Sequence, residues 1–176
     1  MRQNFTDEEW AILLKAPLQG VMAVVLADQV DPVAFLQELM AGIRIVEEEL
    51  QRTDIAGELA PQLAQAIGEI DTQDPLEGEQ LLLKKEFELI GLIQTFKGSK
   101  EGKRYAVEHF RKVADILERK VTGIYATDCK RWLMSIAQKT AESQKEGGFL
   151  GIGASRISEK ESDVLKDLAE ALRLEL

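Results

Sequence analysis

Residues 16–30 read APLQGVMAVVLADQV and include the most apolar run of the chain, residues 21–27. In a helix built from this stretch, apolar side chains point in nearly every direction, which is typical of a helix enclosed by others. Pro17 is expected in its first turn, where a missing N–H costs little. The apolar run is far shorter than the roughly 20 residues of a membrane-spanning helix. We therefore predict a central apolar helix over residues 16–30 and no membrane span.

A separate short helix is predicted before this stretch, over residues 7–15. Thr6 and Glu9 have the spacing of a capping box, in which each side chain accepts a hydrogen bond from the other residue's backbone. Phe5 and Trp10 occupy the two positions of a hydrophobic staple, which fixes the path of the chain into a helix. The start of this first helix is therefore the best-specified local feature of the sequence.

Helix-start signals recur along the rest of the chain, and no segment alternates polar and apolar residues as a strand does. The segment after Ser99 has a narrow apolar seam at alternating spacings of four and three, typical of a helix packed almost parallel to a neighbour. The sequence predicts one all-α domain over residues 1–176, a bundle of about seven or eight helices. The predicted starts are Asp31-Pro32, Thr53 or Asp54, Asp74-Pro75, Ser99, Thr127 or Asp128, and Ser158 with Glu161.

The composition is typical of a globular protein in a reducing compartment. Hydrophobic residues make up 45% and charged residues 30% of the chain, which suffices to bury a core without disulfides or a structural metal. The single cysteine, Cys129, cannot form an intramolecular disulfide. Acidic residues occupy the N-terminus, where a secretory signal would need a basic and then an apolar region. We therefore expect a cytoplasmic location.

The net charge of −9 is divided unevenly along the chain. Residues 1–80 hold 4 basic and 16 acidic residues, and residues 81–176 hold 18 basic and 15 acidic residues, so the two parts carry −12 and +3. This polarity argues against nucleic-acid binding by the first part. A basic window at residues 97–120 also contains interspersed acidic residues, which is typical of a solvated helix. Nucleic acid is therefore not an expected partner.

Patterns of catalytic or metal-binding residues are missing from the sequence. His109 is the only histidine and lies in no Glu-x-x-His pattern, which excludes a di-iron site of the helical-bundle type. Cys129 is expected at the start of a helix, where a thiolate is favoured. No orienting third residue accompanies it, and a lone cysteine is more often a small buried hydrophobe. We predict no catalytic residue, no metal and no cofactor.

A glycine-rich stretch at residues 147–156, GGFLGIGASR, is a candidate ligand site. The backbone N–H groups of Gly151 and Gly153 could bind an anion or a nucleotide together with Arg156. Phosphate loops follow a strand and open directly into a helix, whereas this stretch follows a predicted helix. The alternative, which we favour, is a structural connector that Phe149 anchors on the bundle.

A stripe of small residues along the apolar helix is a second candidate site. Gly20, Ala23 and Ala27 lie at spacings of three and four, so they share one face of the helix. Small side chains let another helix approach closely. We interpret the stripe as tight packing within one core; the alternative is a groove that receives a partner helix or an acyl chain.

Two segments at the ends of the chain have a distinctive pattern. Residues 130–153 read KRWLMSIAQKTAESQKEGGFLGIG and are followed by ISEKE at residues 157–161, while residues 5–10 read FTDEEW and residues 16–17 read AP. These segments, roughly a third of the chain, resemble the ends of a family of small bacterial all-helical proteins of uncharacterised activity. The resemblance implies no activity, cofactor or catalytic residue.

The leading functional hypothesis is a non-enzymatic helical interaction protein that self-associates or binds a partner helix. The opposite charges of the two parts of the chain, with an apolar helix that a small bundle covers incompletely, predict a homodimer weakened by salt. The alternative is a protein that binds an apolar small molecule between its helices. An enzyme that binds an anion or nucleotide with residues 147–156 ranks third.

Overall fold

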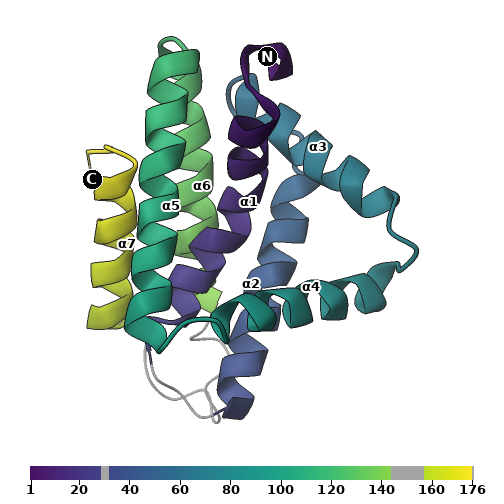
Figure 1. Cartoon of the computed structure of the whole chain (residues 1–176), viewed down its shortest axis with the longest axis vertical. Helices are drawn as coiled ribbons and strands as arrows, with labels where there is room; N and C mark the ends of the chain where they lie inside the picture. The colour runs from purple at the N-terminus through teal and green to yellow at the C-terminus, as the bar shows by residue number, and fades with distance from the viewer. Residues whose placement is uncertain (29–31, 144–156, 176) are drawn as a thin grey trace.

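A computed structural model describes residues 1–28, 32–143 and 157–175 of the chain. Within these ranges the chain forms seven α-helices and no strand, which confirms the predicted all-α fold and number of helices (Figure 1). None of the described helices is long and apolar enough to cross a membrane. In chain order the helices are α1 (Asp7–Val25), α2 (Pro32–Leu50), α3 (Leu59–Thr72), α4 (Gly78–Ile93), α5 (Ser99–Lys120), α6 (Ile124–Ser143) and α7 (Glu159–Ala171).

The first helix begins as its capping residues predict. The Glu9 N–H donates to the Thr6 hydroxyl at 3.1 Å, and the Thr6 N–H donates to the Glu9 carboxylate at 2.9 Å. The rings of Phe5 and Trp10 are both buried, with their centroids 5.6 Å apart. The capping box and the hydrophobic staple are therefore confirmed, and they join the N-terminal residues to the core.

The expected break before Pro17 is wrong, because α1 continues through this residue to Val25. Pro17 is itself buried, and burial of the apolar residues around it favours one continuous helix over the local preference of proline for a helix start. A side chain from α5 also contacts this part of α1: the Nε2–H of His109 donates to the Ile12 carbonyl at 2.8 Å. The two helices predicted over residues 7–15 and 16–30 are therefore one helix, which ends at Val25.

The main core lies around the C-terminal part of α1. Residues 20–27 are buried, and α1 packs against every other helix of the described chain. Figure 1 shows α5, α6 and α7 side by side along the long axis of the molecule, with α1 beside α5 and α6. The predicted seam of α5 is fully buried, which confirms its inward orientation. Its members are Ala106, Phe110, Val113 and Leu117.

Helices α3 and α4 form a less enclosed part of the molecule, which we call the arm. In Figure 1 they extend away from α7 and meet at a corner, and α4 runs across the direction of α5. The arm packs against α2 through both of its helices, and α3 also packs against α6 and α1. Lys85 of α4 contacts Glu47 of α2, and its ammonium lies 2.6 Å from the Asp71 carboxylate of α3. This ion-pair cluster connects the three helices.

Three predicted helix starts are wrong by several residues, because the expected capping side chains bind other groups or lie inside a helix. Helix α3 begins at Leu59 instead of near Asp54, whose carboxylate accepts a hydrogen bond from Arg52 at 2.8 Å. Helix α4 begins at Gly78, and Asp74 accepts the Leu76 N–H at 3.0 Å. Helix α6 begins at Ile124, before both predicted capping positions.

The last predicted helix start is confirmed. The Glu161 N–H donates to the Ser158 hydroxyl at 3.1 Å, and the Ser158 N–H donates to the Glu161 carboxylate at 2.7 Å. The predicted start at Asp31-Pro32 includes Asp31, which lies outside the described residues, while Pro32 is the first residue of α2. Capping boxes with both partners close in sequence are therefore the most dependable boundary signals in this chain.

Candidate functional site on helix α4

The small-residue stripe is buried inside the bundle. Gly20, Ala23 and Ala27 are all buried, and a Cβ atom added at Gly20 would lie 3.2 Å from the ring of Phe110 and 3.7 Å from the Cβ of Ala137. Helices α5 and α6 therefore already occupy the groove that the stripe forms. Within the part of the chain that the structure describes, these three positions are therefore packed inside one core and are not part of an exposed surface.

The glycine-rich stretch lies outside the described residues. This applies to Phe149, Gly151, Gly153 and Arg156, which were the candidate residues for an anchored connector or an anion site. Both interpretations of residues 147–156 stay predictions.

Cys129 has no features of a nucleophile. It lies within α6 and not at the start of the helix, and its side chain is fully buried. Burial raises the pKa of the Cys129 thiol to about 12, although the neighbouring Lys130 acts in the opposite sense. The thiol is therefore protonated at neutral pH and behaves as a small hydrophobe.

His109 is a structural side chain in the junction of α1 and α5. Burial lowers the pKa of His109, and the positive charges of Lys112 and Lys15 lower it further, while the hydrogen bond to Ile12 acts in the opposite sense. The imidazole is therefore neutral at pH 7 and donates its Nε2 proton. Across the described ranges, no group of three or more His, Cys, Asp or Glu side chains could hold a metal ion.

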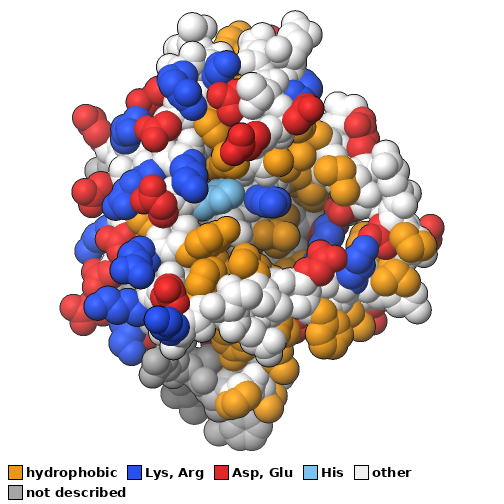
Figure 2. All heavy atoms as spheres, in the orientation of Figure 1, with side chains coloured by type: hydrophobic (Ala, Val, Ile, Leu, Met, Phe, Trp, Pro, Cys, Tyr) orange, Lys and Arg blue, Asp and Glu red, His pale blue; other side chains and the backbone are white. Residues whose placement is uncertain are grey.

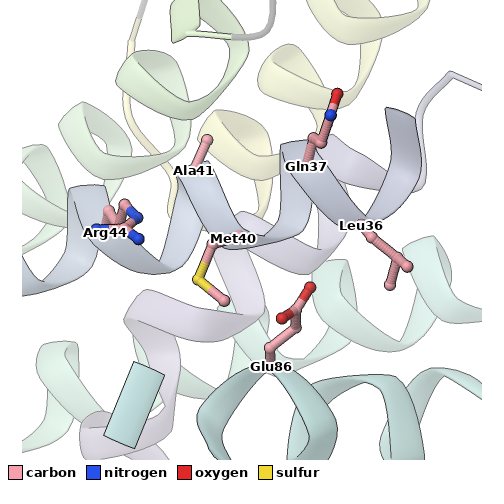
Figure 3. Close-up of a pocket in the computed structure, with 6 residues that line it drawn as sticks. All are labelled: Leu36, Gln37, Met40, Ala41, Arg44 and Glu86. Carbon is pink, nitrogen blue, oxygen red and sulfur yellow. The ribbon is translucent and has the colours of Figure 1, made fainter. Parts of the chain in front are cut away.

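A hollow of about 490 Å³ lies between α2 and α4 (Figure 3). In Figure 3 the side chain of Glu86 extends from α4 towards α2 and ends between Leu36 and Met40. Only 8% of Glu86 is exposed, so its carboxylate faces mainly apolar side chains. We call this feature the Glu86 hollow; it is lined by Leu36, Gln37, Met40, Ala41, Arg44 and Glu86.

Glu86 has no partner for its charge among the residues that the structure describes. Arg44 lines the same hollow, but its guanidinium lies 3.3 Å from the carboxylate of Glu79, another residue of α4. Burial raises the pKa of Glu86, and no neighbouring group offsets this effect. The carboxylate of Glu86 lines an open hollow and keeps some contact with solvent, but it has no hydrogen bond or counter-ion among the described residues, so this site differs from an ordinary part of the core.

The second part of the site is the solvent-facing surface of α4, which we call the outer face. Leu83 and Phe87 lie one turn apart on it, and they are 46% and 70% exposed. They line a second hollow, of about 640 Å³. The outer face consists of Leu76, Gln80, Leu83, Lys84, Phe87 and Glu88.

The charges of the outer face lie beside its apolar pair. Lys84 contacts Asp74, and its ammonium lies 4.0 Å from the Glu88 carboxylate one turn further along α4. Figure 2 shows how the two parts of the molecule differ on this side: hydrophobic side chains gather over α1 and the arm, whereas charged side chains cover α5. Three of the large apolar side chains that are exposed, Ile70, Leu83 and Phe87, belong to the arm.

Leu83, Glu86 and Phe87 were not predicted as candidate site residues from the sequence. Helix α4 has apolar residues on nearly all sides, as α1 does, yet only one side of it is covered by α2. The signal in the sequence was the large number of apolar residues in this helix at the end of the bundle. A peripheral helix cannot bury every side, so some of its apolar side chains must be exposed. Comparison with protein-family models, curated proteins and solved structures finds no match to this chain, so the argument for function rests on these residues.

Proposed function

We propose that this protein is a non-enzymatic helical interaction protein that self-associates through the outer face of α4. The observation that carries the proposal is the exposure of Phe87, 70% of which faces solvent one turn from Leu83. Full burial of a Phe or Leu side chain contributes about 1.5–3 kcal/mol. Two such side chains on one helical face form a stripe that another helix can cover.

The charges beside the stripe favour a second copy of the same chain as the partner. Lys84 and Glu88 lie one turn apart with opposite charges. When two α4 helices pack antiparallel about a twofold axis between residues 85 and 86, Lys84 of each copy lies near Glu88 of the other. Leu83 of each copy then lies beside Phe87 of the other. A self-complementary face of this kind is what a twofold dimer requires.

Two side chains that could act as a nucleophile or a base, Cys129 and His109, are taken up by the fold. The Cys129 thiol is buried and protonated, and the His109 ring donates its proton to a backbone carbonyl. Neither group is available to a substrate. Self-association through exposed side chains needs neither of them.

The proposal is tested by light scattering at high micromolar concentration, in low and in high salt. We expect a dimer that dissociates as salt rises, because charge pairs at an exposed rim are screened. Phe87→Ser is expected to be monomeric. Ile124→Ser is the matched control, since Ile124 of α6 is 65% exposed but lies away from α4, and this variant should remain dimeric. A monomeric wild-type protein at low salt, or a dimeric Phe87→Ser variant, contradicts the proposal.

A pair of charge variants tests the antiparallel arrangement. Glu88→Lys places two positive charges on each α4, and Lys84→Glu places two negative charges there, so each variant alone should dimerise more weakly. When the two variants are mixed, every pair across an antiparallel interface has opposite charges. Native mass spectrometry should then detect the mixed dimer in preference to either homodimer. A random mixture of the three dimers would contradict this arrangement.

A further inference from the structure

Glu86 differs from the other buried carboxylates in having no partner. Glu49 is 2% exposed, but it contacts Lys139 and accepts a hydrogen bond from Arg52 at 2.9 Å. Glu161 is 3% exposed, and it accepts the Ser158 N–H in a capping box. Glu86 is 8% exposed, and within the described parts of the chain nothing donates to it. Glu86 is therefore a little-exposed acceptor for a positive charge that has no donor among the described residues.

The surroundings of Glu86 decide which kind of group can bind there. A metal ion needs several oxygen ligands, whereas the hollow has a single carboxylate among mostly apolar side chains. An anion would be repelled by Glu86. A neutral apolar molecule would leave the carboxylate without a partner. A group with a positive end and an apolar body satisfies both Glu86 and the side chains of Leu36 and Met40, which flank it (Figure 3).

We propose that the Glu86 hollow binds an organic ammonium ion, with the ammonium group on the Glu86 carboxylate and the apolar body against Leu36 and Met40. The hollow volume of about 490 Å³ is in the range of small-molecule sites. Arg44, at the other end of the lining, keeps the positive group at Glu86, because the guanidinium repels it. This site is separate from the outer face and does not depend on self-association.

The binding test uses the methionine methyl groups as reporters in NMR spectra of the ¹³C-methyl-labelled protein. Met40 lines the hollow, while Met22 is fully buried in the core and reports any general change of structure. The probes are 2-phenylethylammonium, its neutral analogue 2-phenylethanol, and the lysine model Nα-acetyl-lysine N-methylamide. We expect a saturable shift of the Met40 methyl signal with at least one of the two ammonium probes, and none with the alcohol.

Two variants test the role of the carboxylate. Glu86→Gln keeps the shape of the side chain but removes its charge, and it should weaken ammonium binding about tenfold or more. Glu170→Gln is the control, because this carboxylate is exposed on α7 and lines neither hollow, and the affinity of this variant for the probe should equal that of the wild type. An unchanged Met22 signal in each variant shows that the fold is retained.

The possible results separate the two sources of such a group. Binding of phenylethylammonium alone assigns the hollow to a free small amine, and binding of the lysine model alone assigns it to a lysine side chain of a partner. Binding of both probes supports recognition of the ammonium group that the two share. The proposal is overturned if neither ammonium probe gives saturation at millimolar concentration, if 2-phenylethanol binds equally well, or if Glu86→Gln binds as tightly as the wild type.

Discussion

Helices α4 and α5 follow one another in the chain, but the rest of the fold covers them differently. Helix α5 buries nine residues, including the fully buried Phe110, between α1, α6 and α7. Helix α4 buries only Glu86 and Leu89, and its Phe87 faces solvent. The α5 region therefore provides the stability of the molecule, while the arm retains apolar surface and a buried charge that the fold does not need. Surplus groups of this kind are suited to binding.

The largest expected effect compares the two phenylalanines. Phe110→Ala should lower the free energy of unfolding by about 3–5 kcal/mol, because it removes a fully buried ring and leaves a cavity. Phe87→Ala should change it by no more than about 0.5 kcal/mol in the monomer, since the ring is exposed. Urea unfolding at low micromolar concentration measures both values. Similar losses for the two variants would mean that the arm is as enclosed as the core.

A smaller effect compares two helical glycines. A Cβ atom at Gly42 of α2 would lie 2.4 Å from a methyl group of Val21, so Gly42→Ala should cost about 1–3 kcal/mol. A Cβ atom at Gly68 of α3 would meet nothing within 4 Å, so Gly68→Ala should stabilise the protein by about 0.5–1 kcal/mol through helix propensity. Thermal unfolding of both variants checks the signs. Stabilisation by Gly42→Ala would show that α1 and α2 can separate at little cost.

The smallest expected effect is a dependence of stability on pH, which arises from His109 in the α5 region and from Glu86 in the arm. Burial lowers the pKa of His109, so the unfolded chain takes up its proton first as the pH falls below about 6.5. The contribution of His109 to stability is therefore present above that pH, and it declines by at most about 1.4 kcal/mol per pH unit on acidification. His109→Gln should be less sensitive than the wild type between about pH 7.5 and about pH 5.5 in urea unfolding. An identical pH slope in the two proteins would contradict the neutral, buried imidazole.

Glu86 should act in the opposite direction. Burial raises the pKa of Glu86 in the folded protein, so its contribution is fully present below the ordinary glutamate pKa and is lost as the pH rises through the raised value. Glu86→Gln should consequently be more stable than the wild type at neutral pH. Urea unfolding at about pH 7.5 and about pH 5.5 measures this gain in stability. A loss of stability in Glu86→Gln would indicate a partner for the carboxylate within the folded chain.

The parts of the fold that could be predicted are those in which the interacting residues are close in sequence. Thr6 with Glu9 and Ser158 with Glu161 mark helix starts correctly, because each pair forms its hydrogen bonds within one turn. Pro17 was misinterpreted because its effect depends on distant residues. The packing of α1 against α5 and α6 decides that the helix continues. A local rule for proline contains no information about such packing.

The candidate site could not be predicted for a related reason. The apolar residues of α4 were visible in the sequence, but their periodicity does not reveal which side a neighbour covers. The position of α2 buries Glu86 and leaves Phe87 exposed, although the two residues are adjacent in sequence. The small-residue stripe shows the converse case, since Gly20 has the pattern of a binding groove and is filled by Phe110 from α5.

The burial of Cys129 also gives the protein an internal reporter of local opening. Because this thiol is the only one in the chain and is fully buried in α6, a thiol-specific reagent can react only after α6 has opened. The rate of modification therefore measures how often the core around α6 is exposed, without any added label. A ligand in the Glu86 hollow that left this rate unchanged would act on the arm alone, whereas one that slowed it would be coupled to the opening of α6.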